Sequence, residues 1–390
     1  MNKIIYIVNA KIPTAKAHGY QITKMCEEFA RQGVDVDPVR GREGSQRASA
    51  SNGVELWLPD KKEARGGDVF KEYSLINNFA IKKLPTVEFA GYWAQLISFY
   101  FFAILRAVFL NRKTIIYSRD LAPSLLSFLG FRVVFECHRV PERGRNLFLF
   151  MSRRLHRIVA VTSGIADVFL KGGVDASGIS VVPDAFDPKT FDINISKEEA
   201  RKKLKLPQDK KILMYCGAFR TMSMGKGIEE ILGALKMFDE SVVFVAVGGT
   251  TEDIIYYQSK ADGMELSGRV IFLPRVGREE VAFYERAADV LLMPFPYTRH
   301  YAYYMSPLKM FEYMASGRPI VTTDLPAIRD VLSEKSAVLV QPDDVNALYR
   351  GVKTVLDDEP MAERIAQKAK TDVVQYTWSN RARKIIGFIN

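Results

Sequence analysis

Cysteine and histidine are scarce in this chain of 390 residues. The three cysteines, Cys26, Cys137 and Cys216, are too widely spaced for a disulfide framework or a C-x-x-C metal knuckle. The four histidines do not show the spacing of a zinc site. We therefore expect a reducing compartment and no bound metal.

Several signature motifs are also missing. The sequence has no G-x-S-x-G segment of a serine hydrolase and no P-loop ending in Gly-Lys-Ser/Thr. The apolar start, Met1–Asn9, is too short for a secretory signal and is better interpreted as a buried first strand. No uninterrupted apolar run reaches 20 residues. The chain is too long for one ordinary hydrophobic core and fits two domains.

Positive charge is concentrated in the first half. The net charge of the chain is +10, and residues 1–190 contain 27 Lys and Arg against 18 Asp and Glu. A basic half favours an acidic partner, such as a nucleic acid, an anionic membrane surface or a phosphorylated substrate.

Short apolar runs alternate with amphipathic segments of helical length, which is typical of parallel sheets covered by helices. The expected strands are 4–8, 34–39, 114–117, 133–136, 158–162, 179–182, 211–216, 242–247, 270–273, 290–293, 320–322 and 337–340. The expected helices of the first half are 21–32, 123–129, 146–155 and 165–170.

This series pauses once, at Pro183–Pro188, where two prolines and two aspartates indicate a turn or linker. The sequence thus predicts an α/β protein with two doubly wound Rossmann-like domains, residues 1–190 and 191–373, and a last helix, 374–390, that returns to the first domain. Such sheets bind ligands beyond the carboxyl ends of their strands, here expected in a central cleft that both domains face.

Residues Tyr92–Leu110 are unusually apolar but include Gln95, Ser98 and Arg106. Three interpretations remain open: a buried or half-buried helix, which we favour, a membrane-surface helix, or a membrane span.

The most distinctive motif is Ser306–Pro319. Ser306 is expected to cap a helix, Pro307 to occupy its first position, and Gly317 to end it. Such a helix start binds phosphate through free backbone N–H groups, and Lys309 would add a full positive charge. Glu312 lies about 7.5 Å further along the axis, where its carboxylate could accept hydrogen bonds from a ribose diol. The alternative is a capped helix with a surface glutamate.

A second phosphate-site layout opens the second domain. A strand ends at Cys216, a glycine-containing loop follows with Gly217, Arg220 and Lys226, and a helix begins at Ile228. The two cations could neutralise a diphosphate, or they could be solvated surface charges.

In the first domain, two loops at expected strand ends contain histidine. His18 and Gly19 lie in the first loop and His138 in the second. Histidine at such a point can form hydrogen bonds or transfer a proton near neutral pH, although a structural role is the alternative.

Taken together, these motifs resemble the retaining GT-B glycosyltransferases of family 4. The resemblance is carried by Ser306–Pro319, the Gly217–Gly227 loop, the linker from Val181, the segment Ala288–Pro294 and the terminal Tyr376-Thr377-Trp378. It spans nearly the whole chain and is clearest over residues 114–380.

The resemblance implies a role for each matching position. His138, Arg220 and Lys226 would be catalytic, with His138 meeting the donor sugar and the two cations holding the diphosphate. The donor would also be bound by Gly19, Gly217, Arg275, Val276, Tyr304, Ser306, Pro307, Leu308, Lys309 and Glu312. Tyr304 stands where the family usually has the first glutamate of a pair, eight residues before the ribose glutamate, so backbone groups near Met305–Leu308 are expected to make that sugar contact.

The implied reaction moves a sugar from a nucleoside diphosphate to an acceptor hydroxyl with retention of configuration and without a metal or other cofactor. The acceptor or membrane side would include His18, Arg139, Arg143 and Arg145, because arginines flank an apolar ridge over residues 139–157. The expected partners are the donor, a saccharide or lipid-linked acceptor and an anionic membrane surface. The expected location is cytoplasmic or peripheral on the inner face of the plasma membrane.

Two rival interpretations remain. A nucleotide-sugar 2-epimerase would share the fold. A basic nucleic-acid-binding protein is permitted by the charge, but no recognition motif or aromatic stacking platform accompanies it, so we expect no nucleic acid.

Overall fold

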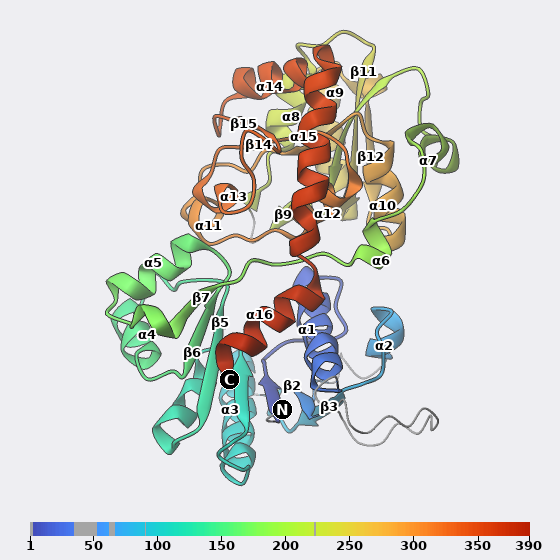
Figure 1. The fold of residues 1–390 in the computed structure, drawn as a ribbon. Helices are drawn as coiled ribbons and strands as arrows, with labels where there is room; N and C mark the ends of the chain where they lie inside the picture. Colours follow the sequence, from blue (N-terminus) through green and yellow to red (C-terminus); the bar gives the residue numbers. More distant parts are fainter. Residues whose placement is uncertain (1–2, 35–52, 62–66, 90, 222–223) are drawn as a thin grey trace. The chain divides into compact units, whose positions relative to one another are not determined.

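The computed structural model describes residues 3–34, 53–61, 67–89, 91–221 and 224–390. The chain divides into two compact units (Figure 1). The first comprises Met1–Pro183 and Trp378–Asn390, and the second comprises Asp184–Thr377. The first unit therefore ends before the expected boundary near residue 190. The reason is that Phe186 already pairs with the last residues of the second unit, donating its N–H to the carbonyl of Tyr376 at 3.0 Å.

The first unit contains a parallel sheet of seven strands in the order β3-β2-β1-β4-β5-β6-β7. The strands are β1 (Ile4–Ile7), β2 (Val54–Pro59), β3 (Ala80–Leu84), β4 (Ile115–Ser118), β5 (Arg132–Cys137), β6 (Arg157–Ala160) and β7 (Ile179–Val181). All four residues of β1 are buried, because helices cover both faces of a parallel sheet.

Helices of the first unit form two layers. The elements are α1 (Ala17–Val34), α2 (Val69–Glu72), α3 (Gly91–Val108), the 3₁₀ segment η2 (Ala122–Leu129), α4 (Arg145–Ser152), α5 (Ser163–Lys171), η3 (Ala176–Gly178) and α16 (Trp378–Ile389). On one face, α1 contacts α16, and Phe29 of α1 stacks edge-on against Tyr117 at 5.3 Å. On the other face, α3 and η2 pack on Ile7, Trp57 and Val133.

The second unit contains a parallel sheet of six strands in the order β12-β11-β8-β13-β14-β15. They are β8 (Lys211–Cys216), β11 (Val242–Gly249), β12 (Val270–Pro274), β13 (Val290–Met293), β14 (Ile320–Thr323) and β15 (Val338–Val340). A separate antiparallel pair joins β9 (Arg220–Thr221) to β10 (Met224–Gly225). The prediction of two doubly wound α/β domains is therefore confirmed.

The helices of the second unit cover both faces of its sheet. They are α6 (Pro188–Phe191), α7 (Lys197–Leu204), α8 (Ile228–Leu235), α9 (Thr251–Gly263), η4 (Ser267–Arg269), α10 (Arg278–Ala287), α11 (Arg299–Tyr303), α12 (Leu308–Ser316), α13 (Pro326–Arg329), α14 (Val345–Asp357), α15 (Glu359–Asp372) and η5 (Val373–Gln375). The core of this unit is divided by the sheet into two buried apolar clusters, one on each face.

Some sequence-based boundaries were wrong. The sequence analysis did not anticipate β2 or β3, and most of the expected strand at 34–39 lies outside the described residues, while Val34 ends α1. Helix α1 begins at Ala17, earlier than expected, so His18 and Gly19 lie in its first turn rather than in a loop.

Helix α3 is the one described helix that is long and apolar enough to cross a membrane, judged by length and composition. One face, including Phe99 and Ala103, is buried against the sheet, while Trp93 and Ile97 are 71% and 66% exposed. The helix is therefore half-buried, as one of the open interpretations predicted.

Candidate active site

The carboxyl end of β8 leads into the first candidate loop. Gly217 has a φ of +123°, which favours glycine, and its N–H donates to the carbonyl of Val247 at 2.8 Å. A Cβ at Gly217 would lie 3.1 Å from the Nζ of Lys309. The loop therefore leaves room for a lysine side chain directly against its backbone.

The loop closes on α8 through a second constrained glycine. Gly227 has a φ of +88° and is the N-cap of α8, where no side chain caps the helix. A Cβ on Gly227 would lie 1.9 Å from the carbonyl oxygen of Pro294. Only glycine fits this approach, so the position of the loop is fixed by backbone contact with the end of β13.

Helix α12 begins one residue later than the sequence predicted. Pro307 is the N-cap, Leu308 is the first helical residue, and no side chain caps the helix. Ser306 is not the cap, because its Oγ accepts a hydrogen bond from the N–H of Asp184 at 2.9 Å. Gly317 ends the helix with a φ of +66°, as predicted. The start of α12 is free of capping side chains and acidic residues, which suits an anion.

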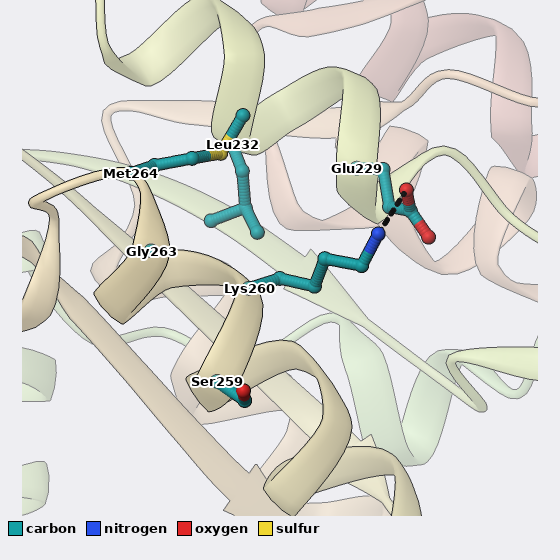
Figure 2. Close-up of a pocket in the computed structure, with 6 residues that line it drawn as sticks. All are labelled: Glu229, Leu232, Ser259, Lys260, Gly263 and Met264. Carbon is teal, nitrogen blue, oxygen red and sulfur yellow. Dashed lines mark hydrogen bonds and ion pairs between the residues drawn. The ribbon is translucent and has the colours of Figure 1, made fainter.

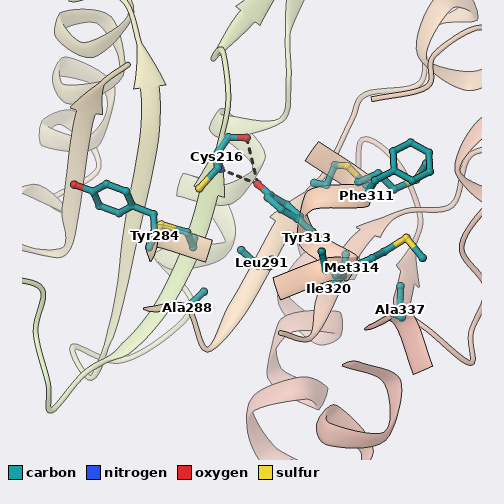
Figure 3. Close-up of a cluster of buried hydrophobic side chains, with 14 of the residues drawn as sticks. Cys216, Tyr284, Ala288, Leu291, Phe311, Tyr313, Met314, Ile320 and Ala337 are labelled. Atoms are coloured by element: carbon teal, nitrogen blue, oxygen red, sulfur yellow. Dashed lines mark hydrogen bonds between the residues drawn. The ribbon is translucent and has the colours of Figure 1, made fainter. Parts of the chain in front are cut away.

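A tyrosine fixes α12 under the end of β8. The Tyr313 hydroxyl accepts a hydrogen bond from the N–H of Cys216 at 2.7 Å, and the same hydroxyl lies 3.4 Å from the carbonyl of Cys216 (Figure 3). These atoms lie within the buried apolar cluster that also contains Leu291 and Ile320. The rigid connection explains why Lys309 of α12 meets Gly217.

Lys309 is a buried lysine whose amino group has no hydrogen-bond partner in the part of the chain that the structure describes. It is 8% exposed, and its Nζ lies 3.4 Å from the centre of the Tyr215 ring. Burial, followed by the nearby charge of Lys226, lowers the pKa of Lys309 well below its usual value. An anion at this position would therefore relieve an unfavourable arrangement.

Lys226 is a second lysine near this position, and its side chain is half-buried. Burial and the charge of Arg275 lower its pKa to about 8. Arg275 and Val276 follow β12, where Arg275 is exposed and Val276 half-buried. The structure thus places Lys226 between two other predicted donor-binding residues, because Arg275 affects the pKa of Lys226 and Lys226 affects that of Lys309.

Arg220 lies at the edge of this region and already has a partner. Its Nε donates to Asp253 of α9 at 2.6 Å, and its guanidinium lies 5.2 Å from the centre of the Tyr256 ring. The sequence analysis did not single out Asp253. Its signal was available in the capping pattern of Thr250 and Asp253 at the start of α9.

Glu312 is also paired. It is 7% exposed, and its Oε1 accepts a hydrogen bond from Arg278 at 2.6 Å. Arg278 is the first residue of α10 and was missed, although it follows the carboxyl end of β12, where a site residue is expected. Next to this pair, Glu285 is fully buried and neither of its carboxyl oxygens has a hydrogen-bond partner among the described residues.

Burial, followed by the charge of Glu312, raises the pKa of Glu285 well above its usual value. The carboxyl of Glu285 is therefore harder to ionise than that of an exposed glutamate, and it is Glu312 that pairs with Arg278. This leaves Glu312 as the carboxylate that can accept hydrogen bonds from a ligand. Tyr304, which stands in the usual position of another glutamate, is 7% exposed and its hydroxyl accepts from the Nε of Arg299 at 3.0 Å.

In the first unit, His138 belongs to a buried charge network. Its Nε2 lies 2.5 Å from Oε1 of Glu136, and Arg381 of α16 lies 3.2 Å from the same oxygen. The hydroxyl of Tyr117 also donates to Glu136. Burial would raise the pKa of Glu136, but Arg381 and His138 hold it well below its usual value.

His138 is neutral at physiological pH, because burial and the charge of Arg119 lower its pKa to about 3 despite the opposing effect of Glu136. Since an ionised carboxylate only accepts, Nε2 of His138 carries the proton and Nδ1 is left as an acceptor. Such a ring can receive a hydrogen bond from a hydroxyl. The sequence analysis missed Glu136 and Arg381 as the groups that orient this ring.

The start of α1 borders a hollow of about 650 Å³. Its lining includes Asn9, Thr14, Lys16 and His18. Burial and the charge of Arg119 lower the pKa of His18 to about 4, so this ring is neutral as well. Gly19 is buried, and a Cβ there would lie 2.4 Å from the hydroxyl of Tyr73, so the glycine permits close packing.

The three predicted arginines of the acceptor or membrane side do not line this hollow. Arg139 and Arg143 are exposed and Arg145 is half-buried at the start of α4. A separate hollow of about 290 Å³ lies between α8 and α9 and is lined by Glu229, Lys260 and their neighbours (Figure 2). It contains none of the predicted site residues.

Comparison with known proteins identifies the fold and a matching family model. The fold is the GT-B fold: the chain superposes on HepE of Anabaena in complex with UDP with a TM-score of 0.72 at 15% identity, and the match covers 99% of this chain and 98% of that one. The family model described as Glycosyl transferases group 1 matches residues 196–372. Over that segment, the second unit is similar to the group 1 glycosyltransferases.

Two curated relatives extend this finding. An uncharacterised glycosyltransferase of Methanocaldococcus jannaschii is 25% identical over 214 residues, which are 53% of each chain. The phosphatidyl-myo-inositol mannosyltransferase of Mycolicibacterium smegmatis is 25% identical over 271 residues, which are 66% of each chain. The matched part of this chain spans about half the length of most of the curated relatives.

Proposed function

We propose that the protein is a retaining, metal-independent glycosyltransferase of family 4 that uses a nucleoside-diphosphate sugar. The observation that carries this proposal is Lys309, whose buried amino group has no hydrogen-bond partner among the described residues and lies against Gly217 beside the uncapped start of α12. A diphosphate would supply the negative charge that favours the protonated form of this group. The match of residues 196–372 to the group 1 glycosyltransferase model supports this assignment.

The proposed reaction breaks the bond between the sugar C1 and the diphosphate oxygen. The acceptor hydroxyl forms the new bond to C1 on the same face, and its proton goes to the leaving diphosphate. Negative charge increases on the diphosphate as the bond breaks, so fixed cations stabilise the transition state more than the ground state. Lys226, Lys309 and the N–H groups at the start of α12 would supply this stabilisation without a metal, and Arg220 would join them by exchanging Asp253 for phosphate.

The remaining donor contacts follow from the geometry of single groups. Glu312 would accept hydrogen bonds from the ribose hydroxyls while Arg278 holds its carboxylate in place. His138, neutral and oriented by Glu136, would accept a hydrogen bond at Nδ1 from a hydroxyl of the sugar. Backbone groups near Met305–Leu308 would replace the contact that the family usually makes with a carboxylate at the position of Tyr304.

We further propose that the acceptor is a saccharide or a lipid-linked molecule in cell-surface polysaccharide or glycolipid assembly. One relative acts on phosphatidyl-myo-inositol by its name. The basic first half of the chain supports a location at the inner face of the plasma membrane. His18 and the exposed Arg139 and Arg143 would lie on the acceptor or membrane side.

The first test is a thermal-shift screen of UDP-, GDP- and ADP-sugars without metal. A ligand that binds only the folded state raises the melting temperature. We expect one nucleotide to raise it in the wild type and in Glu279→Ala, an exposed carboxylate on the neighbouring α10, but not in Glu312→Ala. No shift with any nucleotide would overturn the proposal.

The same donor then separates transfer from the rival activity. Incubation of the donor without acceptor should leave its sugar configuration unchanged, whereas a nucleotide-sugar 2-epimerase would convert it. Binding to duplex DNA without a response to any nucleotide sugar would instead favour the basic binding protein.

A further inference from the structure

We propose that the helical layer of α3, η2 and α4 docks on an anionic lipid bilayer, with α3 lying along the membrane surface. This inference rests on the peripheral location proposed above and identifies the surface that makes the contact. It is carried by the exposed side chains of this layer, by their alignment and by the charge of the segment.

Exposed apolar side chains are concentrated in this layer. Of the 21 large apolar side chains that are strongly exposed among the described residues, 13 fall between Phe89 and Phe150. On α3, Trp93, Ile97, Phe101 and Leu105 recur every fourth residue and are 71%, 66%, 61% and 48% exposed. Side chains four apart lie on the same side of a helix, so these residues form one apolar row.

The three elements lie side by side on one face of the first sheet. Helix α3 contacts η2, and η2 contacts α4. Val133 of β5 belongs to the cluster under α3 and η2, and Phe135, two residues on and therefore on the same face, stacks on Phe148 of α4 at 6.0 Å. Leu125 and Phe128 of η2 and Leu147 of α4 continue the exposed apolar surface beyond α3.

Part of the positive charge of this segment lies beside this surface. Residues 91–157 contain eleven Lys and Arg but three Asp and Glu. Three of these arginines, Arg119, Arg132 and Arg157, instead bind groups of α1 and α16 on the other face. Of the three acids, Glu136 is fully buried and paired with Arg381. The guanidinium of Arg154 lies 5.0 Å from the ring centre of Phe128, which places positive charge directly beside an exposed apolar side chain of η2.

This combination favours a lipid surface over a membrane span. Helix α3 cannot leave the sheet to cross a bilayer without exposing Trp57 and Ile7, which pack beneath it. An apolar row with an aromatic end at Tyr92 and Trp93, and the cation of Arg154 beside Phe128, match the apolar, interfacial and anionic zones of a bilayer in turn.

Trp93 makes the test direct. The chain has three tryptophans, of which Trp57 and Trp378 are 0% and 1% exposed, so a change in fluorescence on adding vesicles reports on Trp93. With the full chain and vesicles of 30% phosphatidylglycerol in phosphatidylcholine, we expect co-sedimentation, a blue shift of the emission and quenching by brominated lipid. Binding should fall at least tenfold with pure phosphatidylcholine or in 0.5 M salt.

Variants locate the contact. Ile97→Ser combined with Phe101→Ser should reduce vesicle binding at least tenfold, whereas Ile255→Ser, an equally exposed apolar residue on α9, should not change it. The shift in melting temperature on donor binding should be the same in all of these variants. Vesicle binding lost with a normal donor response would define α3 as the docking surface.

Three outcomes would overturn the inference. They are the absence of binding to anionic vesicles at low salt, binding that the α3 variant does not change, and a dimer in sedimentation velocity that the α3 variant dissociates. Each can occur together with a normal donor response, so the proposed sugar transfer can stand when the docking surface fails. Vesicle binding without any shift in melting temperature on adding donor would instead support the docking surface and contradict the proposed sugar transfer.

Discussion

Single side chains in the second unit are held in positions that disfavour their charge. The charge of Lys226 affects the pKa of Lys309, and Lys309 has no hydrogen-bond partner among the described residues. Glu285 is fully buried without a hydrogen-bond partner among the described residues, and burial raises its pKa well above its usual value. Such groups lower the stability of the free protein, and the expected compensation is a ligand that carries the opposite charge.

The pH dependence of donor binding should reveal Lys226. Since its pKa is lowered to about 8, the free protein carries this charge below pH 8 and loses it above. Bound diphosphate stabilises the charged form, so affinity falls as the pH rises from 7 to 9, by about tenfold from this residue alone. In Lys226→Arg the positive charge persists, so the decrease in affinity between pH 7 and 9 should be about tenfold smaller than in the wild type.

Titration calorimetry with the nucleoside diphosphate identified in the screen measures this difference. Any contribution of Lys309 is common to both proteins and cancels in the comparison. Parallel pH profiles for the wild type and Lys226→Arg would contradict the assignment of Lys226 to the phosphate site.

Elements place these side chains through contacts between backbones. The loop after β8 passes so close to Lys309 and to Pro294 that glycine is required at residues 217 and 227. Helix α12 is held to β8 by the Tyr313 hydroxyl rather than by a side-chain cap at its start. The start of α12 can therefore remain open for a ligand while the helix itself stays fixed.

Substitution at Gly227 should disrupt this arrangement. Gly227→Ala places a Cβ 1.9 Å from the carbonyl oxygen of Pro294 on a backbone with a φ of +88°, so we expect the free energy of unfolding to fall by about 2–3 kcal/mol or more. Gly263→Ala, at the end of α9 with no atom within 4 Å, should change it by less than about 1 kcal/mol. Urea denaturation followed by circular dichroism measures both, and equal effects would contradict the packing argument.

At the scale of the whole molecule, the chain returns to the first unit after completing the second. Trp378 is 1% exposed, and Arg381 of α16 forms a buried ion pair with Glu136, the residue that orients His138. Arg381 also donates to the carbonyl of Pro183 at 2.9 Å, next to the point where the chain leaves this unit. The end of the chain is thus part of the structure around a predicted catalytic residue.

Removing the Arg381 charge should destabilise the first unit. In Arg381→Met the buried Glu136 loses its main cationic partner, and we expect a loss of about 3–5 kcal/mol near neutral pH. All three tryptophans lie in the first unit, so urea unfolding followed by tryptophan fluorescence reports on it. The exposed Arg383→Met is the matched control and should change stability by less than about 0.5 kcal/mol.

The effect of Arg381→Met on stability should depend on pH in a defined direction. In the wild type, the depressed pKa of Glu136 contributes stability that is present above the ordinary glutamate pKa and is lost as the pH falls through the folded value. In Arg381→Met burial is no longer opposed by that charge, so protonation of Glu136 becomes favourable. The difference in the free energy of unfolding between the wild type and Arg381→Met should therefore become smaller as the pH falls. A difference that does not change with pH would contradict the role of Glu136.

Local patterns in the sequence determined the fold class and much of the second unit. Apolar runs of strand length separated by amphipathic segments predicted both parallel sheets, because a strand buried on both faces must be apolar along its length. The glycine and proline pattern predicted where α12 ends. Strands β2 and β3 were not predicted. For β3 the reason is that Lys82 and Lys83 interrupt its sequence, so it has no apolar run.

Only the tertiary structure decided which groups share a charge environment. Glu136 and Arg381 are 245 residues apart, and no local pattern connects them. The same holds for Glu312 with Arg278, and for Ser306, whose hydroxyl binds the N–H of Asp184 instead of capping its own helix. The half-buried state of α3 also depended on the fold, because an apolar segment by itself does not determine how many of its faces find a partner. Periodicity fixes local elements, whereas long-range packing fixes the pairs that set the pKa values and the exposed surfaces.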